Sequence, residues 1–129
     1  MNMIDIISKL YDGDIKLYEP AETIPDMIPK ELAEILRESN GIKEIFNVPS
    51  TYATQEIGWI VYTCEMIVEA TDFFRKECHI DGVVFSDDGA GNPFYIKNNG
   101  MIYMYEYEYS DGEEILVSDS LYEYFTDVI

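Results

Sequence analysis

The stretch that most constrains the fold of this chain is residues 82–96, Gly-Val-Val-Phe-Ser-Asp-Asp-Gly-Ala-Gly-Asn-Pro-Phe-Tyr-Ile. Apolar runs of β-branched and aromatic residues stand at both ends, which predicts two strands joined by an acidic, glycine-rich loop. Gly89 and Gly91 can adopt positive φ without a Cβ clash, and Asp87, Asp88 and Asn92 can bond to nearby backbone N–H groups. The residues therefore predict a hairpin with a loop of fixed shape, which is a common place for a functional site.

Three segments before this hairpin have helical periodicity. Asn2 is a predicted N-cap for a first helix, whose apolar residues recur every three to four positions. A second helix is predicted over residues 29–39, because a proline suits its first turn and Ser-Asn-Gly ends it. A third helix is predicted over residues 64–76, with Thr63 as its N-cap and one apolar face.

The segments between the helices have weaker patterns. Residues 15–26 hold two prolines and are predicted to be an irregular link. Residues 42–55 hold a proline among polar residues, which predicts a loop with short extended pieces. Residues 57–62, Ile-Gly-Trp-Ile-Val-Tyr, predict a short buried strand.

Beyond the hairpin, residues 101–109 predict a strand with two different faces. One face carries Tyr103, Tyr105, Tyr107 and Tyr109, and the other carries Ile102, Met104, Glu106 and Glu108. We expect the tyrosine face to be partly buried and the glutamate face to meet solvent. A returning strand at residues 115–117 is followed by a last helix that begins after Ser118 or Ser120, with Ser120 and Glu123 able to form a capping box. This order predicts an α+β fold, an antiparallel meander sheet with N-terminal, middle and C-terminal helices packed on it.

Charge is strongly unbalanced, because 26 acidic residues face 8 basic ones and leave a formal net charge of −18. Such a surface repels phosphate backbones and anionic lipid headgroups, which argues against direct nucleic-acid or membrane binding. No basic residue follows Lys97, so the C-terminal hairpin and helix carry uncompensated negative charge. The composition instead favours a basic partner, and the 129 residues suffice for one domain, residues 1–129, with a hydrophobic core.

The cysteines and the N-terminus indicate the compartment. Cys64 and Cys78 are the only cysteines, too few for a disulfide framework, and both are predicted to be reduced. The N-terminus has no basic lead-in of the export type, and no stretch of the sequence is long and apolar enough to cross a bilayer. We therefore expect a cytoplasmic protein.

The sequence gives little support for catalysis or for a metal. The acidic loop at residues 87–92 lacks the ligand spacing of an EF-hand. Two cysteines and the single His79 do not make a zinc site, and no nucleophile motif or phosphate loop is present. We expect no enzymatic activity, no metal and no cofactor. A hydrolase that uses paired carboxylates is the least favoured of three hypotheses for the function.

Three groups of residues, taken in order, resemble a known family. They are Ile-Pro-Lys-Glu-Leu at residues 28–32 with Ser-Asn-Gly at residues 39–41, the glycine-rich hairpin at residues 82–96, and Val-Ser-Asp-Ser-Leu-Tyr-Glu-Tyr-Phe at residues 117–125. Together they are similar to the SUKH superfamily, which includes yeast cell-wall assembly regulators and bacterial immunity proteins of polymorphic toxin systems. The resemblance spans about residues 24–125 and leaves residues 42–55 unanchored.

The resemblance implies a non-catalytic α+β domain that binds a partner protein, and in bacteria one that blocks a toxin, often a nuclease. A nuclease must be basic to hold phosphates, which would complement this chain's negative charge. We therefore expect an immunity protein for a basic toxin, or alternatively a regulatory protein-binding scaffold without a toxin partner. The predicted partner-binding residues are the carboxylates of the loop and of the C-terminal hairpin: Asp87, Asp88, Glu106, Glu108, Asp111, Glu113 and Glu114.

Overall fold

The computed structural model describes residues 2–48, 53–106 and 112–126. Within these ranges the chain forms, in order, α1 (Met3–Leu10), β1 (Ile15–Leu17), α2 (Lys30–Glu38), β2 (Ile42–Val48), β3 (Ala53–Val61), α3 (Cys64–Cys78), β4 (Val83–Asp87), β5 (Pro93–Ile96), β6 (Ile102–Tyr105), β7 (Glu114–Ser118) and α4 (Leu121–Thr126). None of these helices is both long enough and apolar enough to cross a membrane.

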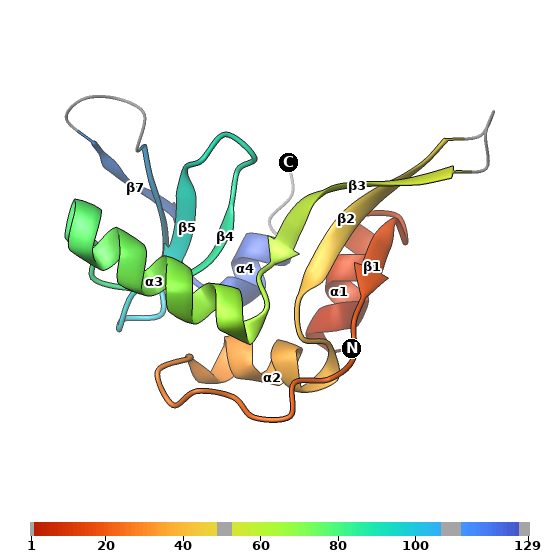
Figure 1. The fold of residues 1–129 in the computed structure, drawn as a ribbon, viewed down its shortest axis with the longest axis horizontal. Coiled ribbons are helices and arrows are strands. Elements are labelled where there is room, and N and C mark those ends of the chain that lie inside the picture. The colour runs from red at the N-terminus through yellow and green to blue at the C-terminus, as the bar shows by residue number, and fades with distance from the viewer. Residues whose placement is uncertain (1, 49–52, 107–111, 127–129) are drawn as a thin grey trace.

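The strands form two antiparallel sheets, which confirms the predicted α+β class. One sheet has the order β1-β2-β3 and the other the order β4-β5-β6-β7, so each is a meander. The sheets meet where β3 ends beside β4: the N–H of Tyr62 donates to the carbonyl of Phe85 at 2.8 Å, and the Ser86 hydroxyl donates to the carbonyl of Trp59 at 3.0 Å. The β2–β3 and β4–β5 hairpins then rise on either side of α4 (Figure 1).

Local capping explains where the helices begin, as the sequence predicted. The side chain of Asn2 accepts from the N–H of Asp5 at 2.9 Å, and the Thr63 hydroxyl accepts from the N–H of Met66 at 3.1 Å. The Ser120 hydroxyl accepts from the N–H of Glu123 at 3.1 Å. Each side chain replaces the missing hydrogen-bond partner of a first-turn N–H.

Two sequence predictions about irregular segments were wrong. In the segment predicted to be a loop, residues 42–48 form β2 and residues 53–55 begin β3, and the segment 15–26 begins with the short strand β1. Two register shifts interrupt the pairing of β2 with β3. The extra residues lie in β3, where Ile57 and Ile60 have no partner in β2, so the alternation of apolar and polar side chains is broken in β3 and its pattern is hidden in the sequence.

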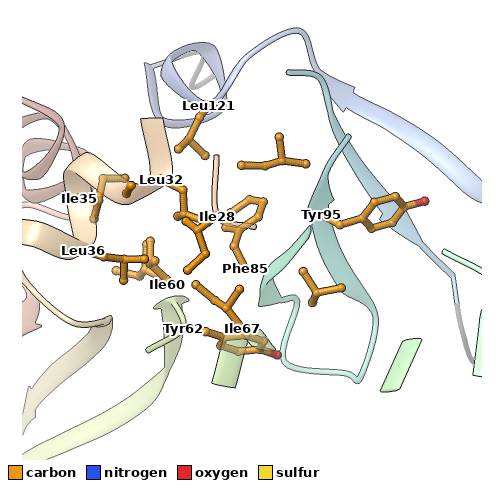
Figure 2. Packing of buried hydrophobic residues seen from close by; sticks show 14 of the residues in the cluster. Ile28, Leu32, Ile35, Leu36, Ile60, Tyr62, Ile67, Phe85, Tyr95 and Leu121 are labelled. Atoms are coloured by element: carbon orange, nitrogen blue, oxygen red, sulfur yellow. The ribbon is translucent and has the colours of Figure 1, made fainter. Parts of the chain in front are cut away.

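The hydrophobic core lies where α1, α2 and α4 meet the two sheets. Leu32 of α2 and the preceding Ile28 lie next to Phe85 of β4, with Leu121 of α4 above them (Figure 2). Ile35 and Leu36 of α2 belong to the same cluster. Ile7 of α1, Ile42, Val61, Ile67 and Phe125 are also buried in this cluster. The core therefore joins the N-terminal and C-terminal helices and fixes the base of both hairpins.

Both faces of β6 are at least partly covered, which corrects the expectation that one of them meets solvent. Tyr103 and Tyr105 are half-buried as predicted, and the Tyr103 ring stacks on that of Tyr95 with centroids 6.0 Å apart. On the opposite face, Ile102 is fully buried and Glu106 is half-buried. Tyr107, Glu108 and Tyr109 lie outside the described residues.

Candidate binding groove between the two sheets

A groove of about 320 Å³ lies between the β2–β3 hairpin and the β4–β5 hairpin. Its lining comes from β2 and β3 on one side, from β4, its following loop and β5 on the other, and from Tyr11 after α1 and Tyr124 of α4. In Figure 1 the two hairpins stand apart, with α4 between them. The lining residues are Tyr11, Glu44, Ile57, Gly58, Trp59, Ile60, Ser86, Asp87, Asp88, Gly89, Phe94 and Tyr124. Carboxylates and aromatic rings therefore dominate its lining.

Asp87 is held in place from both sheets. The buried hydroxyl of Tyr62, just past the end of β3, donates a hydrogen bond to one carboxylate oxygen of Asp87, and the N–H of Gly89 donates to the other at 2.7 Å. Burial, and next the hydrogen bond to Asp87, raise the pKa of Tyr62 well above its ordinary value. Tyr62 therefore stays protonated and keeps donating to the carboxylate at neutral pH.

Asp88 organises the loop itself. Its carboxylate accepts from the N–H of Ala90 at 2.8 Å, from the N–H of Asn92 at 3.1 Å and from the side-chain amide of Asn92 at 2.9 Å. Burial alone would raise the pKa of the Asp88 carboxyl, but these hydrogen bonds outweigh burial and lower that pKa. Gly89 and Gly91 have φ of +85° and +93°, so the predicted fixed loop is present.

Glu44 supplies the third carboxylate, from the opposite wall. It lies on β2 opposite Gly58 of β3, and close enough to Tyr11 to raise the pKa of that phenol, after the larger effect of burial. None of the described residues that line the groove is basic. The ion pairs of the described chain lie elsewhere, at Glu56, Asp72 and Glu114.

Apolar side chains surround these carboxylates. The ring of Tyr124 lies at the base of the groove and contacts Phe94, with centroids 5.5 Å apart. On the arm formed by β2 and β3, Ile57 is 59% exposed and Phe46 is 51% exposed. Because side chains alternate along β2, Phe46 lies on the same face as Glu44. The surface thus offers apolar contact beside negative charge.

Comparison with known proteins assigns the fold to a family. The model of the SMI1/KNR4 family (SUKH-1) matches residues 27–127. The chain belongs to the SMI1/KNR4 family. Searches of curated proteins and of solved structures give no significant match. The match to the SMI1/KNR4 family covers α2 through α4, and hence both walls of the groove, and it confirms the resemblance that the sequence motifs indicated.

The groove brings together two of the carboxylates predicted from the sequence. Asp87 and Asp88 line it, whereas Glu106, Glu113 and Glu114 lie on or beside the β6–β7 hairpin and do not. Glu114 instead accepts from the Tyr95 hydroxyl and pairs with the Lys97 ammonium, each at 2.5 Å. Glu108 and Asp111 lie outside the described residues. A role for any of these seven carboxylates in partner binding stays a prediction.

Sequence reasoning missed Glu44, Tyr11, Tyr62 and Tyr124 as residues of this region of the SMI1/KNR4 fold. They come from α1, β2, the end of β3 and α4, and only the fold makes them neighbours. Glu44 also lies in the segment that was predicted to be a loop. A prediction of the β2–β3 hairpin from the sequence would have placed Glu44 and Phe46, two residues apart, on one face of β2 and so pointed to this wall of the groove.

Proposed function

We propose that this chain is an immunity protein that binds a basic toxin domain and blocks it without catalysing a reaction. The observation that carries the proposal is the groove, in which Glu44, Asp87 and Asp88 lie beside the exposed side chain of Ile57 and partly buried aromatic rings, with no basic residue in the lining. Carboxylates that no cation compensates repel one another, and that repulsion is relieved when a cationic surface docks. Membership of the SMI1/KNR4 family supports a protein-binding role.

Recognition would combine steering and anchoring. The net charge of −18 attracts a basic domain over a distance of about a Debye length, ~8 Å at physiological ionic strength. Asp87 and Asp88 are fixed by hydrogen bonds before the partner arrives, so little conformational entropy is lost when they pair with lysine or arginine. Ile57 and Phe46 on the arm would then supply the apolar contact that slows dissociation.

Co-expression with a candidate basic toxin, encoded beside this gene, tests the proposal. Wild-type protein should restore growth of the producing bacteria, and the Glu44→Lys variant should fail to restore it. Glu34→Lys is the matched control, because it makes the same charge change on the exposed face of α2, away from the groove. Lack of rescue by the wild type, or equal loss in both variants, would reject the proposal.

The same family match also supports a regulatory scaffold that binds a host protein. That alternative uses the same groove but predicts no effect on toxin-producing cells. Rescue of growth decides between the two, because a scaffold without a toxin partner has no reason to protect the cell.

A further inference from the structure

The strand β7 leaves one edge of its sheet without a partner. Within the described ranges it pairs with β6 alone, at the end of the order β4-β5-β6-β7. The carbonyl of Glu113, immediately before β7, accepts from the N–H of Glu106 at 3.0 Å, so the peptide groups of Glu113 face β6. These groups alternate in direction along a strand, and the register shift in β7 comes only after Leu116, so the N–H groups of Glu114 and Leu116 and the C=O of Glu114 point away from β6.

The opposite edge of the same sheet is closed. On β4, the N–H of Val84 donates to the Thr71 hydroxyl of α3 at 2.9 Å, and the carbonyl of Phe85 accepts from Tyr62 at 2.8 Å. The first sheet has two edges: β1, whose three residues offer little backbone for pairing, and β3, whose end is bonded to β4 at Trp59 and Tyr62. The edge of β7 is one place in the described structure where another strand can be added, and the side chains beside it set it apart.

Apolar side chains accompany these free backbone groups. Leu116 is 52% exposed and Val117 is 41% exposed. Natural sheets protect such an edge with charged side chains, very often lysine. Here the charged side chains beside the strand are acidic, at Glu113, Glu114 and Asp119, and the nearby Lys97 is already paired with Glu114. The edge is thus protected against a second copy of this acidic chain but not against a basic segment.

We propose that β7 is a docking edge for an extended segment of a partner polypeptide that carries lysine or arginine. Glu114 and Leu116 lie two residues apart, on one face of β7, and Leu116 continues the row of Tyr103 and Tyr95 across the sheet. A segment added at this edge would place an apolar side chain beside Leu116 and, two residues away, a cationic one beside Glu114, which would then share its carboxylate between Lys97 and the added cation. Backbone hydrogen bonds supply affinity and this spacing supplies selectivity. The proposal rests on β7 and does not require the groove.

A synthetic peptide tests this directly with the intact chain. The probe is a capped peptide of ten residues in which every second residue is threonine. The residues between the threonines are alternately lysine and valine. Nuclear magnetic resonance should show slower exchange of the Glu114 and Leu116 amides when the peptide is added. A peptide with glutamate in place of lysine should give no protection.

Two protein variants locate the contact. Leu116→Lys should weaken binding of the peptide about tenfold, because it removes the apolar contact and adds a like charge. Leu17→Lys is the matched control: Leu17 is 49% exposed on the other edge strand, β1, and its variant should change binding less than about twofold. If Leu116→Lys does not fold by circular dichroism, Leu116→Thr replaces it, with a smaller loss expected.

Several outcomes would overturn the proposal. Absence of peptide binding, equal weakening by Leu17→Lys, or protection at Asp87 and Asp88 instead of β7 would each do so. Sedimentation of the free protein tests the competing occupant: a wild-type dimer that Leu116→Lys separates would show that a second copy covers the edge. A monomer at all concentrations agrees with the proposal.

Discussion

The hydroxyl of Tyr62 donates a hydrogen bond to the carboxylate of Asp87. Tyr62 follows β3 and Asp87 ends β4, so this one bond joins the two sheets beside the groove. The main-chain bond from Tyr62 to Phe85 lies beside it. The side chain that closes the fold at this point therefore also orients a carboxylate of the proposed binding surface.

Removal of this hydroxyl should destabilise the protein. In Tyr62→Phe the half-buried Asp87 carboxylate loses a donor, and we expect the free energy of unfolding to fall by about 1.5–3 kcal/mol. Urea denaturation measures this change. Tyr103→Phe is the control, because the described contact of the Tyr103 hydroxyl is a weak one to the sulfur of Met101 at 3.8 Å, and its expected change is below about 0.5 kcal/mol. Equal losses in both variants would contradict the account.

A methyl group at Gly82 should be poorly tolerated. A Cβ there would lie 2.8 Å from the Tyr95 ring and 2.9 Å from the carbonyl oxygen of Ile96, a contact with fixed backbone. Gly82→Ala should therefore cost about 1–3 kcal/mol in urea denaturation. For Gly58→Ala in β3 no neighbouring atom lies within 4 Å of the added carbon, so stability should stay within about 0.5 kcal/mol or rise. A neutral Gly82→Ala would show that β4 and β5 are not this close.

Stability should fall at alkaline pH. Burial is the main cause that raises the pKa of Tyr62, Tyr95 and Tyr124 above the ordinary value of 10.0. Below pH 10 these phenols are protonated in both the folded and the unfolded chain, so they add no pH dependence. Above pH 10 the unfolded chain releases their protons first, and the free energy of unfolding drops by up to about 1.4 kcal/mol per pH unit for each.

Urea denaturation between about pH 8 and pH 11.5 measures this dependence, with phenolate absorbance as an independent readout. The folded protein should titrate fewer tyrosines near pH 10 than the denatured protein. An unchanged free energy of unfolding from pH 9 to pH 11, with all tyrosines titrating together, would contradict the burial of these rings.

The sequence was most informative where structure depends on neighbouring residues. The caps at Asn2, Thr63 and Ser120, and the turn at Asp87–Asn92, use side chains that bond within four positions along the chain. The β2–β3 hairpin was missed because its bulges disrupt alternation, and its pairing partner cannot be read from either strand alone.

The same difference between local and long-range contacts explains which residues of the groove could be predicted from the sequence. Asp87 and Asp88 were predicted because they belong to a local motif, whereas Glu44, Tyr11 and Tyr124 reach the groove through packing of distant elements. Glu114 was singled out for its charge. Its hydrogen bond with Tyr95 and its ion pair with Lys97 depend on strand register, which the sequence does not fix in advance.

Binding of a purified basic toxin domain to wild-type protein and to the Glu44→Lys and Glu34→Lys variants tests the central claim most directly. Both variants change the net charge equally, so long-range attraction falls equally and any difference reports the groove. We predict that the affinity of Glu44→Lys falls at least about tenfold below that of Glu34→Lys, and that binding of the wild type weakens as salt rises. Equal affinities of the two variants, or wild-type binding that salt leaves unchanged, would contradict recognition through the carboxylates of the groove.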